Sequence, residues 1–451
     1  MRAESGPALA CSAVDNGHQG PESSLRLQLW SYNYAPEPTG IAPVSTVWAT
    51  TLRERGHEVE VVAAHPHYPE PVWGRHPLPY REVRDGVPVL RLPLWAGRRS
   101  AAERIRQEIT FAAAQTAALP LLGRPDVLVS VSPSFPALLP GIINARLRKL
   151  PWVLWLHDLL PEGASATGLL EEGPVLRASR WLERAAYRQA DRIVILSAAL
   201  KEKLIEKGVA PEKIDVICNP ATHDVLPEPV PRPAEGPPRL LSMGNIGRTQ
   251  AIASLVREFE GSPAMRDADA RLIVTGEGVA ADAARAEISG GAVELPGVVS
   301  RERLEDELRT ATLALVSQRY EGTEFNLPSR LMNFMAYGIP VIAIVDPRSE
   351  VGRIVEGSGA GWVVDSSRMA SFPQQAAAVL SDTEELERRG RAGWEYARRN
   401  FSHEGFAERF ETVLRRVAGP KAAHPSKGGR PTAAGAPRTR GSGMRSPSCP
   451  H

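Results

Sequence analysis

Short apolar runs alternate with amphipathic stretches along this chain, and the alternation occurs twice. In the first half the apolar runs lie at residues 25–33, 59–64, 127–131, 152–156 and 193–196. Helical patterns lie between them, and the first of these reaches Arg55 and stops at Gly56. Strands that alternate with helices form parallel sheets with helices on both faces. The first half therefore predicts an open α/β domain.

The alternation restarts after a proline-rich stretch. Strands are predicted at 240–243, 272–275, 313–316, 341–344 and 362–364, and helices at 252–260, 280–289, 301–310, 328–337 and 384–416. The predicted fold class is α/β, with two Rossmann-like domains whose parallel sheets face a cleft. In such sheets ligands bind at the carboxyl ends of the strands.

A length of 451 residues exceeds what one hydrophobic core usually holds, which agrees with two domains. The expected boundaries are a disordered lead-in at 1–24, an N-terminal domain at 25–218, a linker at 219–238, a C-terminal domain at 239–400, a terminal helix at 401–418 and a disordered basic tail at 419–451.

Composition limits the partners and the setting. The 54 Lys and Arg residues nearly balance the 52 Asp and Glu residues, so no strong field favours nucleic acid. Three scattered cysteines and the absence of an apolar signal core predict a cytoplasmic protein. The apolar stretch 111–122 is too short to span a bilayer and is interpreted as a core or domain-face helix. An interfacial helix, in peripheral contact with the inner face of the membrane, is the alternative.

The segment 321–342 carries the strongest functional signal. Pro328 suits the first helical position and Gly338 the position after the helix. The helix between them has an apolar face formed by Leu331, Phe334 and Met335. Its opposite, polar edge is formed by Ser329, Arg330 and Asn333. A serine and an arginine at a helix start suit a phosphate or diphosphate, and an ordinary capped helix is the alternative.

Glycine loops follow several predicted strands. Gly40 precedes the first helix, Asn245 and Arg248 lie in the loop 244–250, and Gly276 and Glu277 follow the next strand. Backbone without a side chain lets a ligand phosphate approach N–H groups, although simple turn chemistry would use the same residues.

A histidine and a carboxylate follow the strand 152–156. His157 and Asp158 at a strand's carboxyl end could transfer protons or bind sugar hydroxyls, and a structural pair is the alternative. Asp267 and Asp269 precede a strand and are discounted as a metal site.

In their order along the chain, these motifs resemble a known family. The segments that carry the resemblance are 34–42, 55–59, 66–69, 157–162, 244–247, 276–278 and 327–330. Over about residues 25–418 the chain is similar to the retaining glycosyltransferases of family 4, which have the GT-B fold, and among them to bacterial colanic-acid and surface-polysaccharide transferases.

The resemblance implies a nucleotide-sugar donor in the second domain, a saccharide or lipid-linked acceptor in the first, retention of configuration, and no metal or other cofactor. The donor-binding residues would be Gly40, Asn245, Arg248, Gly276, Glu277, Asn326, Ser329, Arg330 and Asn333. The catalytic residues would be His157, Asp158 and Glu324, with Glu324 holding the donor sugar.

Three positions depart from the family pattern. Asn333 and Phe325 stand where many members have two glutamates, and Thr249 stands where a lysine is common. Two other functions stay open, the first because such an enzyme has the same two-domain cleft and the second because of the substitutions at Asn333 and Thr249. One is a non-hydrolysing nucleotide-sugar epimerase, and the other is a catalytically silent GT-B scaffold protein.

Overall fold

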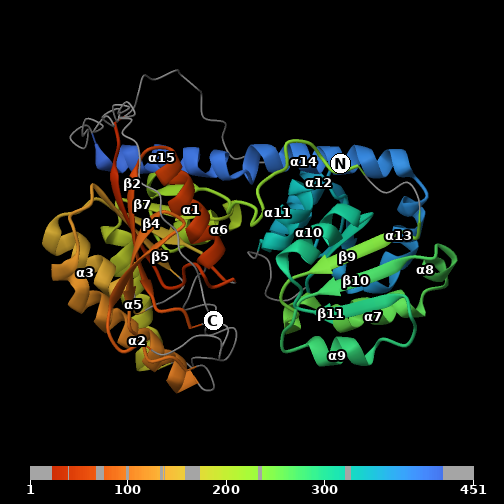
Figure 1. The fold of residues 1–451 in the computed structure, drawn as a ribbon, viewed down its shortest axis with the longest axis horizontal. Helices are drawn as coiled ribbons and strands as arrows, with labels where there is room; N and C mark the ends of the chain where they lie inside the picture. Colours follow the sequence, from red (N-terminus) through yellow and green to blue (C-terminus); the bar gives the residue numbers. More distant parts are fainter. Residues whose placement is uncertain are drawn as a thin grey trace, which may run out of the picture.

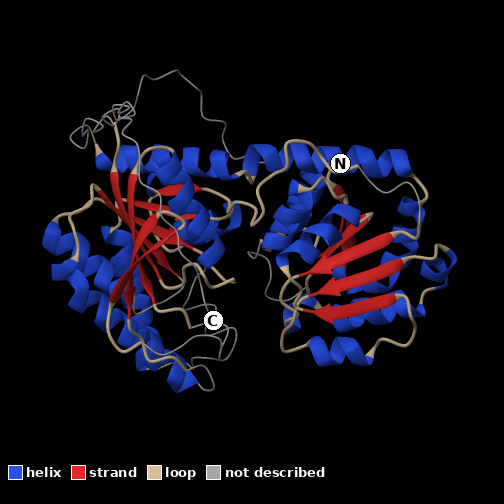
Figure 2. Ribbon diagram, in the orientation of Figure 1, coloured by secondary structure: helices blue, strands red, loops and turns tan. Residues whose placement is uncertain are grey.

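Two sheets, one entirely parallel and the other parallel except for one edge strand, organise the structure, and helices cover both faces of each (Figures 1 and 2). The computed structural model describes residues 23–38, 40–67, 76–97, 101–132, 136, 138–157, 173–231, 236–319 and 327–419. The two sheets occupy separate halves of the molecule in Figure 1. The predicted fold class, α/β with two Rossmann-like domains, is confirmed.

The first sheet has the strand order β3-β4-β2-β1-β5-β6-β7-β8, and only β3 runs antiparallel to its neighbour. Its strands are β1 (Arg26–Ser31), β2 (Glu58–Ala64), β3 (Tyr80–Arg84), β4 (Val87–Leu92), β5 (Val127–Ser132), β6 (Trp152–Leu156), β7 (Arg192–Ile195) and β8 (Ile214–Val216). The helices of this half are α1 (Ala42–Glu54), α2 (Ala101–Ala118), α3 (Leu138–Arg148), α5 (Pro174–Gln189) and α6 (Ala198–Glu206), with short turns η1 (Leu119–Leu121) and η2 (Pro211–Lys213).

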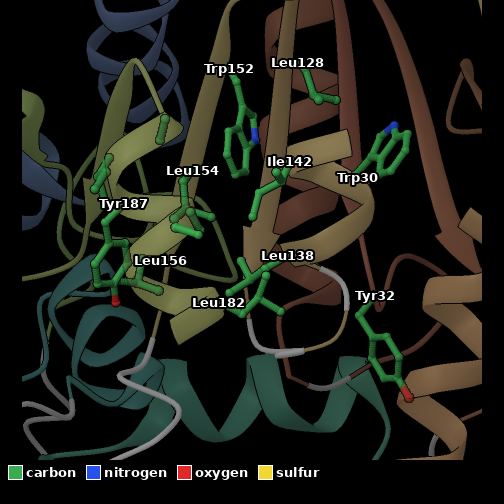
Figure 3. Packing of buried hydrophobic residues seen from close by; sticks show 14 of the residues in the cluster. Trp30, Tyr32, Leu128, Leu138, Ile142, Trp152, Leu154, Leu156, Leu182 and Tyr187 are labelled. Carbon is green, nitrogen blue, oxygen red and sulfur yellow. The ribbon is translucent and has the colours of Figure 1, made fainter. Parts of the chain in front are cut away.

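Successive strand residues of the first sheet enter two different cores. Leu29 packs in the core beneath α1, whereas Trp30 packs in the core beneath α2, α3 and α5. Figure 3 shows the second core, where Ile142 of α3 and Leu182 of α5 approach the side chains of β6. Because both faces are covered, the strands are nearly continuous apolar runs.

The apolar stretch 111–122 forms the end of α2 and the turn η1. Phe111 and Ala118 are buried in the same core as Trp30, as a domain-face helix requires. Among the described residues, no helix has the length and apolar character needed to cross a bilayer.

The second sheet is entirely parallel, with the order β11-β10-β9-β12-β13-β14. Its strands are β9 (Arg239–Met243), β10 (Arg271–Thr275), β11 (Val293–Gly297), β12 (Leu313–Ser317), β13 (Val341–Val345) and β14 (Gly361–Asp365). The helices are α7 (Ile252–Gly261), α8 (Pro263–Asp267), α9 (Ala281–Ala286), α10 (Arg301–Thr310), α11 (Ser329–Ala336), α12 (Glu350–Ser358), α13 (Phe372–Leu380), α14 (Thr383–Asn400) and α15 (His403–Ala418), with turns η3 (Arg248–Gln250) and η4 (Ser366–Ser371).

The last helix returns to the first sheet. The helical region predicted at 384–416 is broken at Phe401 and Ser402, and α14 and α15 together extend over both halves of the molecule (Figure 1). Phe406 and Phe410 of α15 enter the same core as Trp48 of α1. Glu411 of α15 accepts a hydrogen bond from Arg55 at 2.6 Å, so α15 is attached to the first domain although it follows the second domain in the sequence.

The described part of the linker packs against the second domain. The backbone N–H of Leu226 donates to Ala336 at 3.3 Å and that of Val230 to Tyr337 at 3.1 Å. The indole of Trp394 donates to the carbonyl of Leu226 at 2.8 Å. Residues 219–231 are thus held along α11 and α14.

Candidate functional site

The site is built at the carboxyl ends of β9 and β10. β9 and β12 are neighbours, but the chain leaves β9 toward β10 and leaves β12 toward β13, in opposite directions along the sheet. Ligands bind at such a switch point in open α/β sheets. In Figure 1 the arrowheads of β9 and β10 point toward the first domain. The loops that follow these strands, and the start of α11, form the second-domain side of the site.

The two glycine loops are joined to each other. The N–H of Gly244 donates to Thr275 at 2.9 Å, and the N–H of Ile246 donates to the carbonyl of Glu277 at 2.9 Å. Gly276 has a φ of +127°, and a Cβ atom there would overlap the carbonyl oxygen of Gly244. The structure therefore requires glycine at 276 for backbone packing, whether or not a ligand approaches it.

Arg330 is a buried cation beside the first of these loops. Its side chain is only 7% exposed, and a Cβ atom placed on Gly244 would lie 3.9 Å from the guanidinium. No ion pair joins Arg330 to a carboxylate of the described chain, and burial lowers its pKa to about 10. An unpaired buried charge is costly, so this position favours an anion.

The helix that carries Arg330 starts one residue later than predicted. Pro328 is the N-cap residue rather than the first helical residue, with φ −73° and ψ 134°, and no side chain caps α11. Proline has no N–H to leave unpaired, and the backbone donors of the first turn follow it. Ser329 is exposed at that turn, while the predicted apolar residues of α11 are buried and Gly338 ends it at φ +68°.

Asn333 is engaged by the linker. Its side-chain oxygen accepts the backbone N–H of Thr222 at 2.8 Å and that of His223 at 3.3 Å, and the residue is buried. Only its amide NH₂ group is left for a ligand. Asn333 therefore joins the candidate donor helix to the segment between the two domains.

The remaining predicted donor residues lie on the exposed side of the loops. Asn245 and Arg248 are exposed, and η3, which contains Arg248, is fixed because Arg319 donates to the carbonyl of Thr249 at 2.7 Å. Glu277 forms an ion pair with Arg285 of α9. Gly40 has a φ of +67° with open space where its Cβ would be, just before α1 in the first domain.

Of the three predicted catalytic residues, the structure describes His157, which directly follows β6. Its Nε2 atom is buried and has no hydrogen-bond partner among the residues that the structure describes, and burial lowers the pKa of the imidazole to about 3. The ring lies 5.0 Å from that of Trp155, centroid to centroid. His157 is therefore neutral at pH 7. Asp158, Glu324 and Asn326 lie outside the described residues.

A polar group that sequence reasoning missed follows β1 and β2. The buried carboxylate of Glu37 accepts the backbone N–H of His67 at 2.9 Å and the side-chain amide of Asn33 at 2.8 Å. Burial, together with the charge of His76, lowers the pKa of the adjacent His65 to about 4. Segments 34–42 and 66–69, which contain Glu37 and His67, both carry the family resemblance, but nothing in their sequences indicated that the carboxylate of Glu37 would be buried.

Two family models match consecutive parts of the chain. The glycosyl transferase 4-like domain matches residues 39–220, and the glycosyl transferases group 1 model matches residues 237–382. Together they cover the second sheet and every strand of the first sheet except β1, and they meet across the proline-rich linker. Within the described residues, no group of three or more His, Cys, Asp or Glu side chains could hold a metal ion.

Two curated relatives have related sequences. The putative colanic acid biosynthesis glycosyl transferase WcaI of Escherichia coli (strain K12) is 25% identical over 368 residues, which is 74% of this chain and 86% of the relative. The probable glycosyltransferase WbjE of Pseudomonas aeruginosa is 25% identical over 224 residues, 47% of this chain and 55% of that protein.

Solved structures share the fold. The sucrose-phosphate synthase of Thermosynechococcus elongatus superposes with a TM-score of 0.63 at 17% identity, covering 87% of this chain and 98% of its own. HepE of Anabaena in complex with UDP-glucose superposes with a TM-score of 0.62 at 15% identity, covering 86% and 99%. These likenesses show the fold, which is GT-B.

Proposed function

The chain belongs to the glycosyltransferases that join a 4-like domain to a group 1 domain, and from this premise we propose that it transfers a sugar from a nucleoside diphosphate to a saccharide or lipid-linked acceptor, with retained configuration and without a metal. The colanic-acid relative favours an acceptor in polysaccharide biosynthesis. The UDP-glucose complex of HepE makes a uridine nucleotide the first donor to test.

One observation carries the proposal, namely that Arg330 is buried beside the Gly244 loop with no carboxylate partner among the described residues. The leaving diphosphate gains negative charge during transfer, and a cation already held in a water-poor position stabilises that charge without reorganisation. Backbone N–H groups at the start of α11 add to it, and exposed Arg248 lies on the neighbouring loop.

His157 positions a hydroxyl in this mechanism. A histidine whose pKa is about 3 is a weak proton acceptor near pH 7, so its neutral Nε2 serves better as a hydrogen-bond partner of a sugar. Glu324 and Asn326 are proposed to hold the donor sugar, and the amide of Asn333 to reach the ribose.

The test is nucleotide binding followed by transfer. Purified chain is titrated calorimetrically with UDP, GDP, ADP and their sugar conjugates, then assayed for nucleotide release with saccharide acceptors. A donor that binds and turns over only with an acceptor supports the proposal. Binding of no nucleotide, or turnover of a nucleotide sugar to its epimer without acceptor, would overturn it.

A further inference from the structure

Two helices on the outer side of the first domain expose apolar side chains that nothing in the described chain covers. Trp181 of α5 is 59% exposed, and Leu139 and Leu147 of α3 are 45% and 75% exposed. These three line a groove of about 720 Å³ between the helices, together with Arg146 and Arg188. In Figure 1, α3 lies at the end of the first domain away from the second domain, so the groove is separate from the candidate site.

The inner faces of the same helices explain why the groove is stable. Ile142 of α3 and Leu182 of α5 contribute to the core under β6 and also form the floor of the groove (Figure 3). The apolar groups above that floor are therefore held on a fixed surface rather than on a loop.

The exposed face of α5 is basic. Arg177, Trp181, Arg184 and Arg188 are exposed and follow one another at spacings of four, three and four residues, which places them along one stripe. None of these arginines forms an ion pair with a carboxylate of the described residues. The α5 carboxylate, Glu183, is buried and bonded to Lys207 at 2.9 Å, and α3 has no acidic residue.

We propose that this surface, defined by α3 and α5, docks the protein on an anionic lipid bilayer. A tryptophan and leucines among unpaired arginines are the composition of helices that lie in the bilayer interface, where the apolar groups enter the acyl boundary and the cations meet lipid phosphates. A protein partner would need acidic groups that match the groove, whereas a bilayer supplies negative charge over its whole area. The inference goes beyond sugar transfer and does not depend on it.

The test is sedimentation of the full chain with vesicles of phosphatidylcholine, with and without phosphatidylglycerol. We expect binding only with phosphatidylglycerol, weakened by salt. Because each basic residue near an anionic surface contributes about 5-fold, R184Q/R188Q is expected to lose about 25-fold in affinity. W181S is expected to lose about 10-fold, since its indole no longer enters the interface. The matched controls R301Q/R391Q and V298A change exposed residues of the second domain and are expected to bind as the wild type does.

Several results would overturn the proposal. One is equal binding to neutral and anionic vesicles, and another is no binding to either. Equal binding by wild type and R184Q/R188Q would assign the affinity to another basic region, such as the tail at 420–451. A lipid-free dimer that W181S converts to monomer would show instead that a second copy covers the groove.

Discussion

The side-chain oxygen of Asn333 accepts the backbone N–H of Thr222 at 2.8 Å, and this contact joins the candidate donor helix α11 to the segment that follows the first domain. Thr222 is exposed and the hydrogen bond is part-buried, so its loss costs about 0.5–1.5 kcal/mol. N333A is therefore expected to lower the free energy of unfolding by that amount, as measured by urea denaturation. N245A, which removes an exposed asparagine of the same site, serves as the control, and equal losses in the two variants would contradict this role of Asn333.

Gly276 and Gly40 offer a matched pair of glycines at positive φ. An added Cβ at Gly276 would overlap the Gly244 carbonyl, whereas the Cβ position at Gly40 is open. Alanine at either position would be strained by roughly 1–2 kcal/mol because φ is positive. In G276A the added methyl group would also push the Gly244 and Gly276 loops apart. We expect G276A to be the more destabilised variant by thermal denaturation and to lose nucleotide binding. G40A with the larger loss of stability would refute this assignment.

Glu411 makes the attachment of α15 sensitive to acid. Burial opposes ionisation, but hydrogen bonds from His57, Arg55 and Arg415 outweigh it and lower the pKa of Glu411 to about 2. A carboxyl whose folded pKa is depressed contributes stability above its unfolded pKa and loses it as the pH falls. The free energy of unfolding should therefore decline from about pH 4.5 to about pH 2 in the wild type and less steeply in E411Q. E408Q, at an exposed position of the same helix, should keep the wild-type slope.

The ionisation of His157 should not affect the pH dependence of kcat or kcat/KM near neutral pH. Because burial lowers its pKa to about 3, the imidazole stays neutral from pH 5 to pH 9. H157Q is expected to reduce kcat by up to about 10-fold without changing nucleotide affinity, since one hydrogen bond to a hydroxyl is disturbed and none to the diphosphate. An inflection of kcat/KM near pH 6.5 that disappears in H157Q would show that His157 takes up the proton itself.

Sequence patterns predicted most local elements of the fold but not its long-range contacts. Periodicity predicted α10 at its observed bounds, because apolar spacing and end signals are local. The β3–β4 hairpin was missed although Asp85 and Gly86, at φ 50° and 76°, form a turn whose Asp-Gly sequence is a known hairpin signal. The return of α15 to the first sheet depends on partners more than 340 residues away, such as Arg55 and Glu411, so no local pattern contains it.

The candidate site shows the same limit. The residue types of α11 predicted an anion seat, but not that Arg330 would be buried without a carboxylate of the described chain. The burial of Arg330 depends on how α11 packs against the Gly244 loop and the linker. Both segments precede α11 by about 100 residues in the sequence. For the same reason the tethering of Asn333 to Thr222 was not foreseen.

The central claim, that Arg330 is the seat of the donor diphosphate, is tested most directly by thermal unfolding of wild type and R330M with and without UDP. Because Arg330 is buried with no carboxylate partner in the described part of the chain, its charge is not expected to stabilise the empty protein, so R330M should unfold at the wild-type temperature or above it without nucleotide. At 100 times the dissociation constant, UDP should add about 2.7 kcal/mol to the wild type and almost nothing to R330M. R391M, at an exposed arginine of α14, should respond to UDP as the wild type does. An R330M variant that is less stable when empty, or that is stabilised by UDP as much as the wild type, would contradict the account.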